Sequence, residues 1–271
     1  FTAPQDGEYL VRVTDIRGFQ GKDFKYSLTV RPRRPDFKVT VGGIGGGTVP
    51  MGSGREFIVN VERLDDYDGP VRLDITDVPQ GFKVTTPITI EAGQNRAFGA
   101  VYAATNASLP KPPVAKVTAS AMIRGQKVSH PAGDLKGFKP IARPKLLAKV
   151  IPAQGDLPPD VTFENPLELT IAPGETISAR VRIDRRDFKA RVGCGKHDAG
   201  RNLPHGVYVD NIGLNGLLIV EEQNEREFFI TADKWVPETS RLFHIKLDPE
   251  KGITTPPIML HVRKPTTVAA K

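Results

Sequence analysis

The chain has 271 residues and a formal net charge of +7, from 38 Lys and Arg against 31 Asp and Glu. This length allows two domains, because single hydrophobic cores usually stop growing before it. The single cysteine, Cys194, excludes an intrachain disulfide, and the lack of an apolar run of roughly 18 residues excludes a membrane-spanning helix.

Glycine and proline are frequent, with 26 and 24 copies. This composition predicts an all-β fold of many short strands joined by tight turns. Positive residues are mostly interleaved with acidic ones, and we interpret the basic cluster at residues 31–35 as a solvated connector or, alternatively, a contact patch. The positive charge would attract an anionic polysaccharide through its field, and it indicates no specific nucleic acid.

Residues 1–33 contain two segments, 8–13 and 24–30, that alternate between apolar and polar side chains. A loop with two glycines separates them, which predicts a β-hairpin. Because a lone hairpin is marginal in water, we expect this one to pack on something else. It either docks on the following domain or ends a domain whose first part is missing.

Residues 34–141 are expected to form an immunoglobulin-like β-sandwich. Roughly seven alternating segments follow one another at the short spacing that is typical of this fold. The predicted strands lie at 37–41, 55–63, 70–75, 84–90, 97–103 and 114–123, with further short segments between them.

The same order of segments recurs in residues 142–265. The turn Val78-Pro79-Gln80-Gly81 is matched by Leu203-Pro204-His205-Gly206, and the segment that ends at Arg63 is matched by one that ends at Arg185. Residues 96–103 and 226–232 match as well. Because the matches keep their order, we predict two tandem sandwiches, with residues 266–271 as a tail.

Several stretches resemble known bacterial surface proteins. Residues 6–9, 13–15 and 21–28 resemble the final strands of the bacterial pre-peptidase C-terminal (PPC) domain, a secreted jelly-roll sandwich. Residues 202–207, 210–216 and 235–238 are similar to the tail domains of large secreted planctomycete-type surface proteins. The resemblance implies a fold of tandem immunoglobulin-like β-sandwiches preceded by a β-hairpin from a jelly-roll-like module. It also implies an extracellular, cell-surface or periplasmic location.

Two residue clusters have side chains that bind metals. Cys194, His197 and His205 are candidate zinc ligands, although a glycine-rich hairpin loop explains the same residues. Three carboxylates, Asp65, Asp66 and Asp68, are candidate calcium ligands, although an Asp- and Gly-rich turn between strands explains them without an ion. We predict no cofactor and keep both clusters as minor alternatives.

Trp235, the only tryptophan, is a candidate platform for sugar stacking. A lone tryptophan in a sandwich more often fills the core or a domain interface, and that is the interpretation we favour. No serine-hydrolase elbow, phosphate loop or zinc-protease motif occurs in the sequence. The sequence therefore predicts no enzyme.

The predicted function is a non-catalytic, exported structural or interaction module that spaces or docks a larger cell-surface or extracellular assembly. Its partners would be other domains or subunits of that assembly. The alternative is a carbohydrate-binding accessory domain of a secreted hydrolase, which would need an exposed aromatic surface beside Trp235 or Tyr208.

Overall fold

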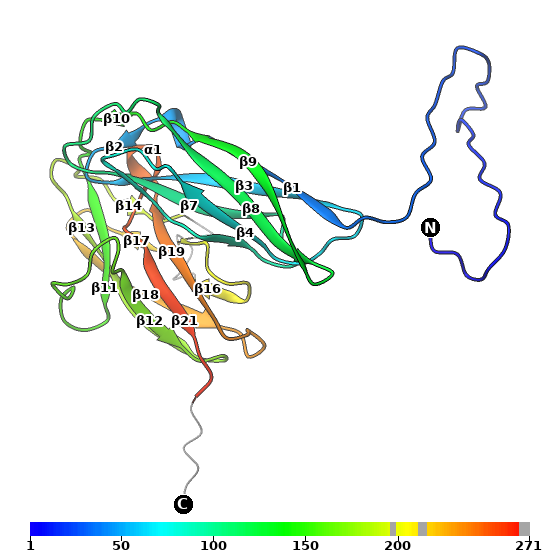
Figure 1. The fold of residues 1–271 in the computed structure, drawn as a ribbon. Coiled ribbons are helices and arrows are strands. Elements are labelled where there is room, and N and C mark those ends of the chain that lie inside the picture. The colour runs from blue at the N-terminus through cyan, green and yellow to red at the C-terminus, as the bar shows by residue number, and fades with distance from the viewer. Residues whose placement is uncertain (196–198, 211–215, 266–271) are drawn as a thin grey trace, which may run out of the picture. The chain divides into compact units, whose positions relative to one another are not determined.

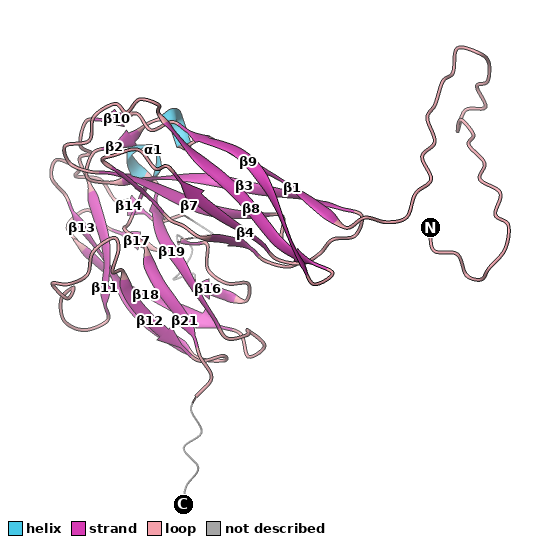
Figure 2. Ribbon diagram, in the orientation of Figure 1, coloured by secondary structure: helices cyan, strands magenta, loops and turns pink. Residues whose placement is uncertain are grey.

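A computed structural model describes residues 1–195, 199–210 and 216–265. The chain divides into two units, Phe1–Arg33 and Arg34–Lys271. Figures 1 and 2 show that the second unit is built from strands joined by loops, with only short helical turns. The predicted all-β fold of tandem immunoglobulin-like sandwiches is confirmed.

The first sandwich consists of two facing antiparallel sheets. One sheet has the order β1-β3-β7-β5, and the other has the order β6-β4-β8-β9. The strands of the first sheet are β1 (Asp36–Val41), β3 (Gly54–Leu64), β7 (Arg96–Ala103) and β5 (Phe82–Val84). Those of the second are β6 (Ile88–Ile90), β4 (Val71–Thr76), β8 (Val114–Ile123) and β9 (Gln126–Lys136).

Alternation explains why these segments form strands. In β4, for example, Val71, Leu73 and Ile75 are buried while the residues between them are more exposed. Their side chains join one core that extends along the chain from Phe37 to Phe138. The segment predicted as one strand, residues 84–90, is instead two strands in different sheets, because Pro87 between them has no N–H group to donate.

The second sandwich also consists of two facing sheets, but β12 and β21 form a parallel pair in one of them. One sheet has the order β11-β13-β18-β16, and the facing sheet contains β12, β21 and β19 with β15 at its edge. The strands of the first sheet are β11 (Leu147–Pro152), β13 (Thr176–Asp184), β18 (Glu225–Ala232) and β16 (Val207–Val209). Those of the second are β12 (Leu167–Ile171), β21 (Ile258–Val262), β19 (Thr239–Leu247) and β15 (Gly200–Arg201). A separate core between the sheets extends along the chain from Leu146 to Val262.

Short elements connect or flank these sheets. The first sandwich adds the 3-10 turn η1 (Gly45–Gly47) and β2 (Val49–Pro50), which pairs in parallel with β10 (Pro140–Ile141). The second adds the pair β14 (Val192–Gly193) and β17 (Leu218–Ile219), the short helix α1 (Pro249–Gly252) and β20 (Ile253–Thr254). No helix among the described residues is long and apolar enough to cross a membrane.

The two sandwiches share one sheet through β20. Thr254 and Ile253 pair with β19 of their own sandwich and also with Gly54 and Arg55 at the start of β3 in the first sandwich. The backbone hydrogen bonds therefore continue from one sandwich into the other.

The two proline turns have the same geometry. In both, the N–H group of the first strand residue, Phe82 or Val207, donates to the carbonyl of the proline, at 3.1 and 2.9 Å. Gly81 and Gly206 have the same φ of 82°, in the left-handed region that favours glycine. Both turns therefore bend the chain into a strand that pairs with the corresponding neighbour, β7 or β18.

Arg63, near the end of β3, and Arg185, directly after β13, play the same role. The Nε atom of Arg63 donates to the carbonyl of Gln94 at 3.2 Å, and the Nε atom of Arg185 donates to the carbonyl of Gln223 at 3.0 Å. Each guanidinium thus ties β3 or β13 to the turn that precedes its neighbour in the sheet, β7 or β18.

Residues 1–33 contain no strand, so the predicted hairpin between 8–13 and 24–30 is not formed. The turn at its tip is present, because the N–H of Gly18 donates to the carbonyl of Asp15 at 3.1 Å. The flanking apolar side chains, such as Leu10 and Ile16, are exposed. Two strands without a covering layer bury too little apolar surface to offset the entropy of pairing.

The matched glycines allow a direct test of the two proline turns. Replacing Gly81 by Ala should cost about 1–2 kcal/mol, because a side chain must then adopt a left-handed φ. The Gly206→Ala variant should cost about 1 kcal/mol more, since its Cβ would lie 2.6 Å from the indole of Trp235 and 2.8 Å from Val236. Urea unfolding measures both losses, and equal losses would contradict the close approach of Trp235 to this turn.

Candidate functional site

The junction between the two sandwiches buries charged side chains. Arg55 and Glu56 begin β3, and both are less than a tenth exposed. In an isolated sandwich, alternation with the buried Phe57 would direct Glu56 to solvent. Here the second sandwich covers that face, and the burial of Glu56 follows from the docking of the two sandwiches.

Glu56 is held by side chains that come from the second sandwich. Arg201 makes a bidentate pair with it, with Nε–Oε2 and Nη2–Oε1 distances of 2.7 and 2.9 Å. Lys246 Nζ lies 3.2 Å from Oε1, and His244 Nε2 lies 3.4 Å from Oε2. The Arg201 guanidinium also lies over the ring of Phe98, 4.0 Å from its centroid.

The environment shifts the pKa values of this cluster. Burial by itself would raise the pKa of Glu56, but hydrogen bonds from His244 and Arg201 outweigh it and lower this pKa to about 2. Burial lowers the pKa of His244, and the Glu56 carboxylate opposes this shift only in part. Glu56 is therefore ionised and His244 neutral near pH 7, with His244 Nε2–H donating to the carboxylate.

Arg55 and Tyr102 add polar contacts across the same junction. Arg55 Nη1 donates to the carbonyls of Glu250 and Gly252 at 2.9 and 3.2 Å. The Tyr102 hydroxyl donates to the carbonyl of Thr255 at 2.6 Å. Gly54 is required at this point, because a Cβ there would lie 2.2 Å from Thr254 Oγ1 and 2.4 Å from the Tyr102 ring.

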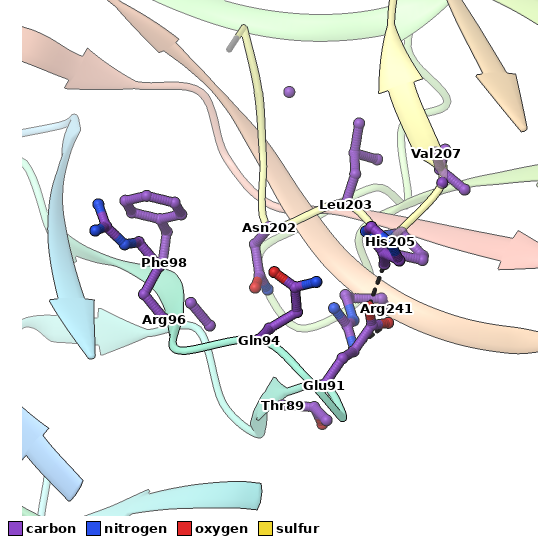
Figure 3. Close-up of a pocket in the computed structure, with 14 residues that line it drawn as sticks. Thr89, Glu91, Gln94, Arg96, Phe98, Asn202, Leu203, His205, Val207 and Arg241 are labelled. Atoms are coloured by element: carbon purple, nitrogen blue, oxygen red, sulfur yellow. Dashed lines mark hydrogen bonds and ion pairs between the residues drawn. The ribbon is translucent and has the colours of Figure 1, made fainter. Parts of the chain in front are cut away.

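A polar cleft of about 240 Å³ opens beside the junction, between β6 and β7 of the first sandwich and the second proline turn. Figure 3 shows Glu91 facing Arg241 and the turn at His205. Glu91 Oε1 lies 2.9 Å from Arg241 Nη2, and Glu91 Oε2 accepts the backbone N–H of His205 at 2.8 Å. Burial lowers the pKa of Arg241, and the Glu91 carboxylate opposes that shift.

Trp235 lies beside the proline turn that lines this cleft and not in the core. The residue is 58% exposed, and its ring lies 5.1 Å from the His205 ring. The prediction that Trp235 fills the core or an interface is therefore wrong. The next residue, Val236, is buried and takes the core position, which directs the indole outward.

The candidate zinc ligands are not brought together in the part of the chain that the structure describes. Cys194 is buried, and this burial raises the pKa of its thiol to about 12. His205 lies on the exposed proline turn beside Trp235. His197 lies outside the described residues. No cluster of three metal-binding side chains occurs among residues 1–195, 199–210 and 216–265.

The candidate calcium ligands have protein partners. Asp65 Oδ2 accepts the N–H of Arg34 at 2.8 Å, and Asp68 Oδ1 accepts the N–H of Gly93 at 3.1 Å. Asp65 and Asp66 have φ values of 47° and 63°, which a tight turn requires. These contacts account for the acidic turn, and calcium binding stays an untested minor alternative.

The residues that matter most at the junction, Glu56, Arg201 and His244, are not singled out by the sequence. Each occupies a position in an ordinary strand pattern, and only the second sandwich gives them a common environment. Local alternation carries no signal for a contact between residues so far apart in the chain.

No protein-family model and no curated protein sequence matches the chain. Several solved structures are similar at low scores.

The D00-D0 domain of intimin matches with a TM-score of 0.27 and 11% identity, covering 84% of this chain and 100% of that one. A protein of unknown function from Porphyromonas gingivalis W83 matches with a TM-score of 0.28 and 9% identity, covering 83% and 99%. Domains 4–9 of the surface layer protein SbsC match with a TM-score of 0.26 and 13% identity, covering 86% of this chain and 32% of that one. At these scores none of them carries its function over to this chain.

The charge of Arg201 should matter far more than that of an exposed cation at the same junction. We expect Arg201→Met to lower the free energy of unfolding by about 3 kcal/mol, because it leaves Glu56 buried without its main partner while keeping an apolar stem on Phe98. The matched control is Lys83→Met, since Lys83 pairs with Glu164 between side chains that are 49% and 66% exposed. This control should lose less than about 1 kcal/mol, and a similar loss in both variants would contradict the role of Glu56.

Acid should destabilise the chain in two steps. Because the pKa of His244 is lowered in the folded chain, His244 contributes its full stabilisation above pH 6.5, the usual histidine pKa. This stabilisation is lost as the pH falls below that value, because the unfolded chain then binds a proton that the folded chain does not. The lowered pKa of Glu56 gives stability that is lost between 4.5 and about 2. Urea midpoints from pH 8 to pH 3 should show that His244→Gln removes the first decline and keeps the second. An unchanged first decline in this variant would contradict the assignment.

Proposed function

We propose that this chain is a non-catalytic, exported structural or interaction module that spaces or docks parts of a larger cell-surface or extracellular assembly. The observation that carries the proposal is the junction between the sandwiches. Interfaces between domains usually permit relative motion unless they are extensive and well packed. Here a shared sheet through β20 and the buried Glu56 cluster fix the second sandwich against the first.

The apolar side chains of residues 1–33 support a docking role. Tyr9, Val11 and Val13 alternate on one segment, Tyr26 and Leu28 on the other, and all are exposed. Such a segment gains stability only when another layer covers it. We propose that this layer belongs to the jelly-roll-like PPC module that these residues resemble, which would place the two sandwiches next to a further domain of the assembly.

The polar contacts support a non-catalytic role. The arrangement nearest to a hydrolase triad is Ser240, His261 and Glu168, in which Ser240 Oγ lies 2.8 Å from His261 Nδ1 and His261 Nε2 lies 3.4 Å from Glu168. These residues lie on three adjacent strands of one sheet, and Arg263 donates to the same serine oxygen. A nucleophile needs a base, an oxyanion site and a substrate cavity together. Ser240 lines none of the five best-formed cavities of the described residues.

The spacer role is tested by the distance between the sandwiches. Spin labels at Lys127→Cys and Glu222→Cys, one exposed position in each sandwich, should give a narrow distance distribution by pulsed electron resonance. The buried Cys194 should stay unlabelled because its thiol is inaccessible. Arg201→Met in the same background should broaden the distribution. A distribution that is already broad in the parent chain would exclude a fixed spacer.

A further inference from the structure

The cleft beside the junction contains polar groups that the protein itself does not use. Within the described part of the chain, the side-chain amide of Gln94 makes no hydrogen bond. The backbone carbonyl of Gln94 accepts a hydrogen bond from Arg63. Asn202 Nδ2 donates to the carbonyl of Leu242 at 2.8 Å, which leaves its amide oxygen available. In Figure 3 the side chains of Gln94 and Asn202 point toward one another. A ligand in the cleft would find both donors and acceptors.

The cleft is lined by one carboxylate, Glu91, and two guanidinium groups, Arg96 and Arg241. Arg241 is paired with Glu91 at 2.9 Å, so the floor of the cleft presents a neutral pair whose outer oxygens and N–H groups are fixed in place. A phosphate or another strong anion would compete with Glu91 for this arginine. The cleft therefore fits a unit rich in hydroxyl groups, either neutral or carrying a single carboxylate, better than a phosphate.

An exposed aromatic pair lies at the turn that lines the cleft, with His205 in the lining and Trp235 beside it. The rings of His205 and Trp235 lie 5.1 Å apart at an angle of 53°. Gly206 lets the indole lie against the turn, since a Cβ at this position would come within 2.6 Å of the ring. The orientation of the indole is thus set by the turn, while most of its surface faces solvent.

These features together match the chemistry of a sugar chain. The C–H groups on one face of a pyranose ring pack against an aromatic ring, and the hydroxyl groups at its edge exchange hydrogen bonds with amides, carboxylates and guanidinium groups. A cavity of about 240 Å³ is slightly smaller than the ~300–1,000 Å³ pockets of drug-sized ligands, which suits one small polar unit. We propose that the cleft binds one sugar residue of a saccharide chain and that the neighbouring residue stacks on Trp235.

This site goes beyond the spacer role. A module with a rigid junction and no sugar site would still space an assembly, whereas the cleft needs the junction because both sandwiches line it. A narrow distance distribution without sugar binding would therefore overturn the sugar site and leave the spacer role standing.

The single tryptophan makes the proposal directly testable. Because Trp235 is the only tryptophan in the chain, its fluorescence reports on the proline turn beside the cleft alone. We would titrate the full chain with three soluble probes: a cello-oligosaccharide, a chito-oligosaccharide and an oligogalacturonate. At least one of them should change the emission saturably, and calorimetry with Trp235→Ala should show that binding is lost.

Two further variants separate the cleft from the general surface. Gln94→Ala removes a side chain without a hydrogen bond of its own, keeps the carbonyl that holds Arg63, and should weaken binding about tenfold. Phe229→Ala removes another exposed aromatic ring of the second sandwich and should leave binding unchanged. The proposal would be overturned if no probe gave a saturable change, or if Gln94→Ala bound as tightly as the parent chain.

Discussion

The arrangement of the sandwiches depends on the burial of one carboxylate, Glu56. Removing an ionised group from water costs several kcal/mol unless its partners restore the lost interactions. All three of those partners, Arg201, His244 and Lys246, come from the second sandwich. The start of β3 can therefore be covered only by a surface that presents these donors in the right places, which selects one orientation of the second sandwich over others.

Backbone pairing between β20 and β3 also constrains the orientation of the two sandwiches. The β20 strand is two residues long, so its hydrogen bonds alone would hold the junction weakly. Gly54 lets β20 approach β3, and Arg55 places its guanidinium on the carbonyls around α1. The short pairing and the buried charges thus constrain each other, because a shift in register would separate Arg55 and Glu56 from their partners together.

Local patterns in the sequence predict most of the fold and little of the site. Alternation and the two proline turns suffice for the strands, because both depend on neighbours within a few residues. Glu56 defeats this reasoning, since its outward position in β3 indicates solvent while a distant part of the chain buries it. The prediction for Trp235 errs in the opposite direction, since a large aromatic side chain is expected in the core but this one is exposed. The neighbouring Val236 fills the core position instead. Residues 1–33 have the pattern of strands but lack a layer to cover them.

The cleft and the junction are linked through consecutive residues. Arg201 binds Glu56 at the centre of the junction, and the next residue, Asn202, lines the cleft. One wall of the cleft belongs to β6 and β7 of the first sandwich, whereas the opposite wall is the proline turn of the second. Its width is therefore set by the docking of the two sandwiches, with Glu91 joining both walls at Arg241 and at the N–H of His205. A rigid junction reduces the ordering cost of binding at such a cleft, because the polar groups are already placed before a ligand arrives. The contacts that hold the two sandwiches together thus also fix the walls of this cleft, to which both sandwiches contribute.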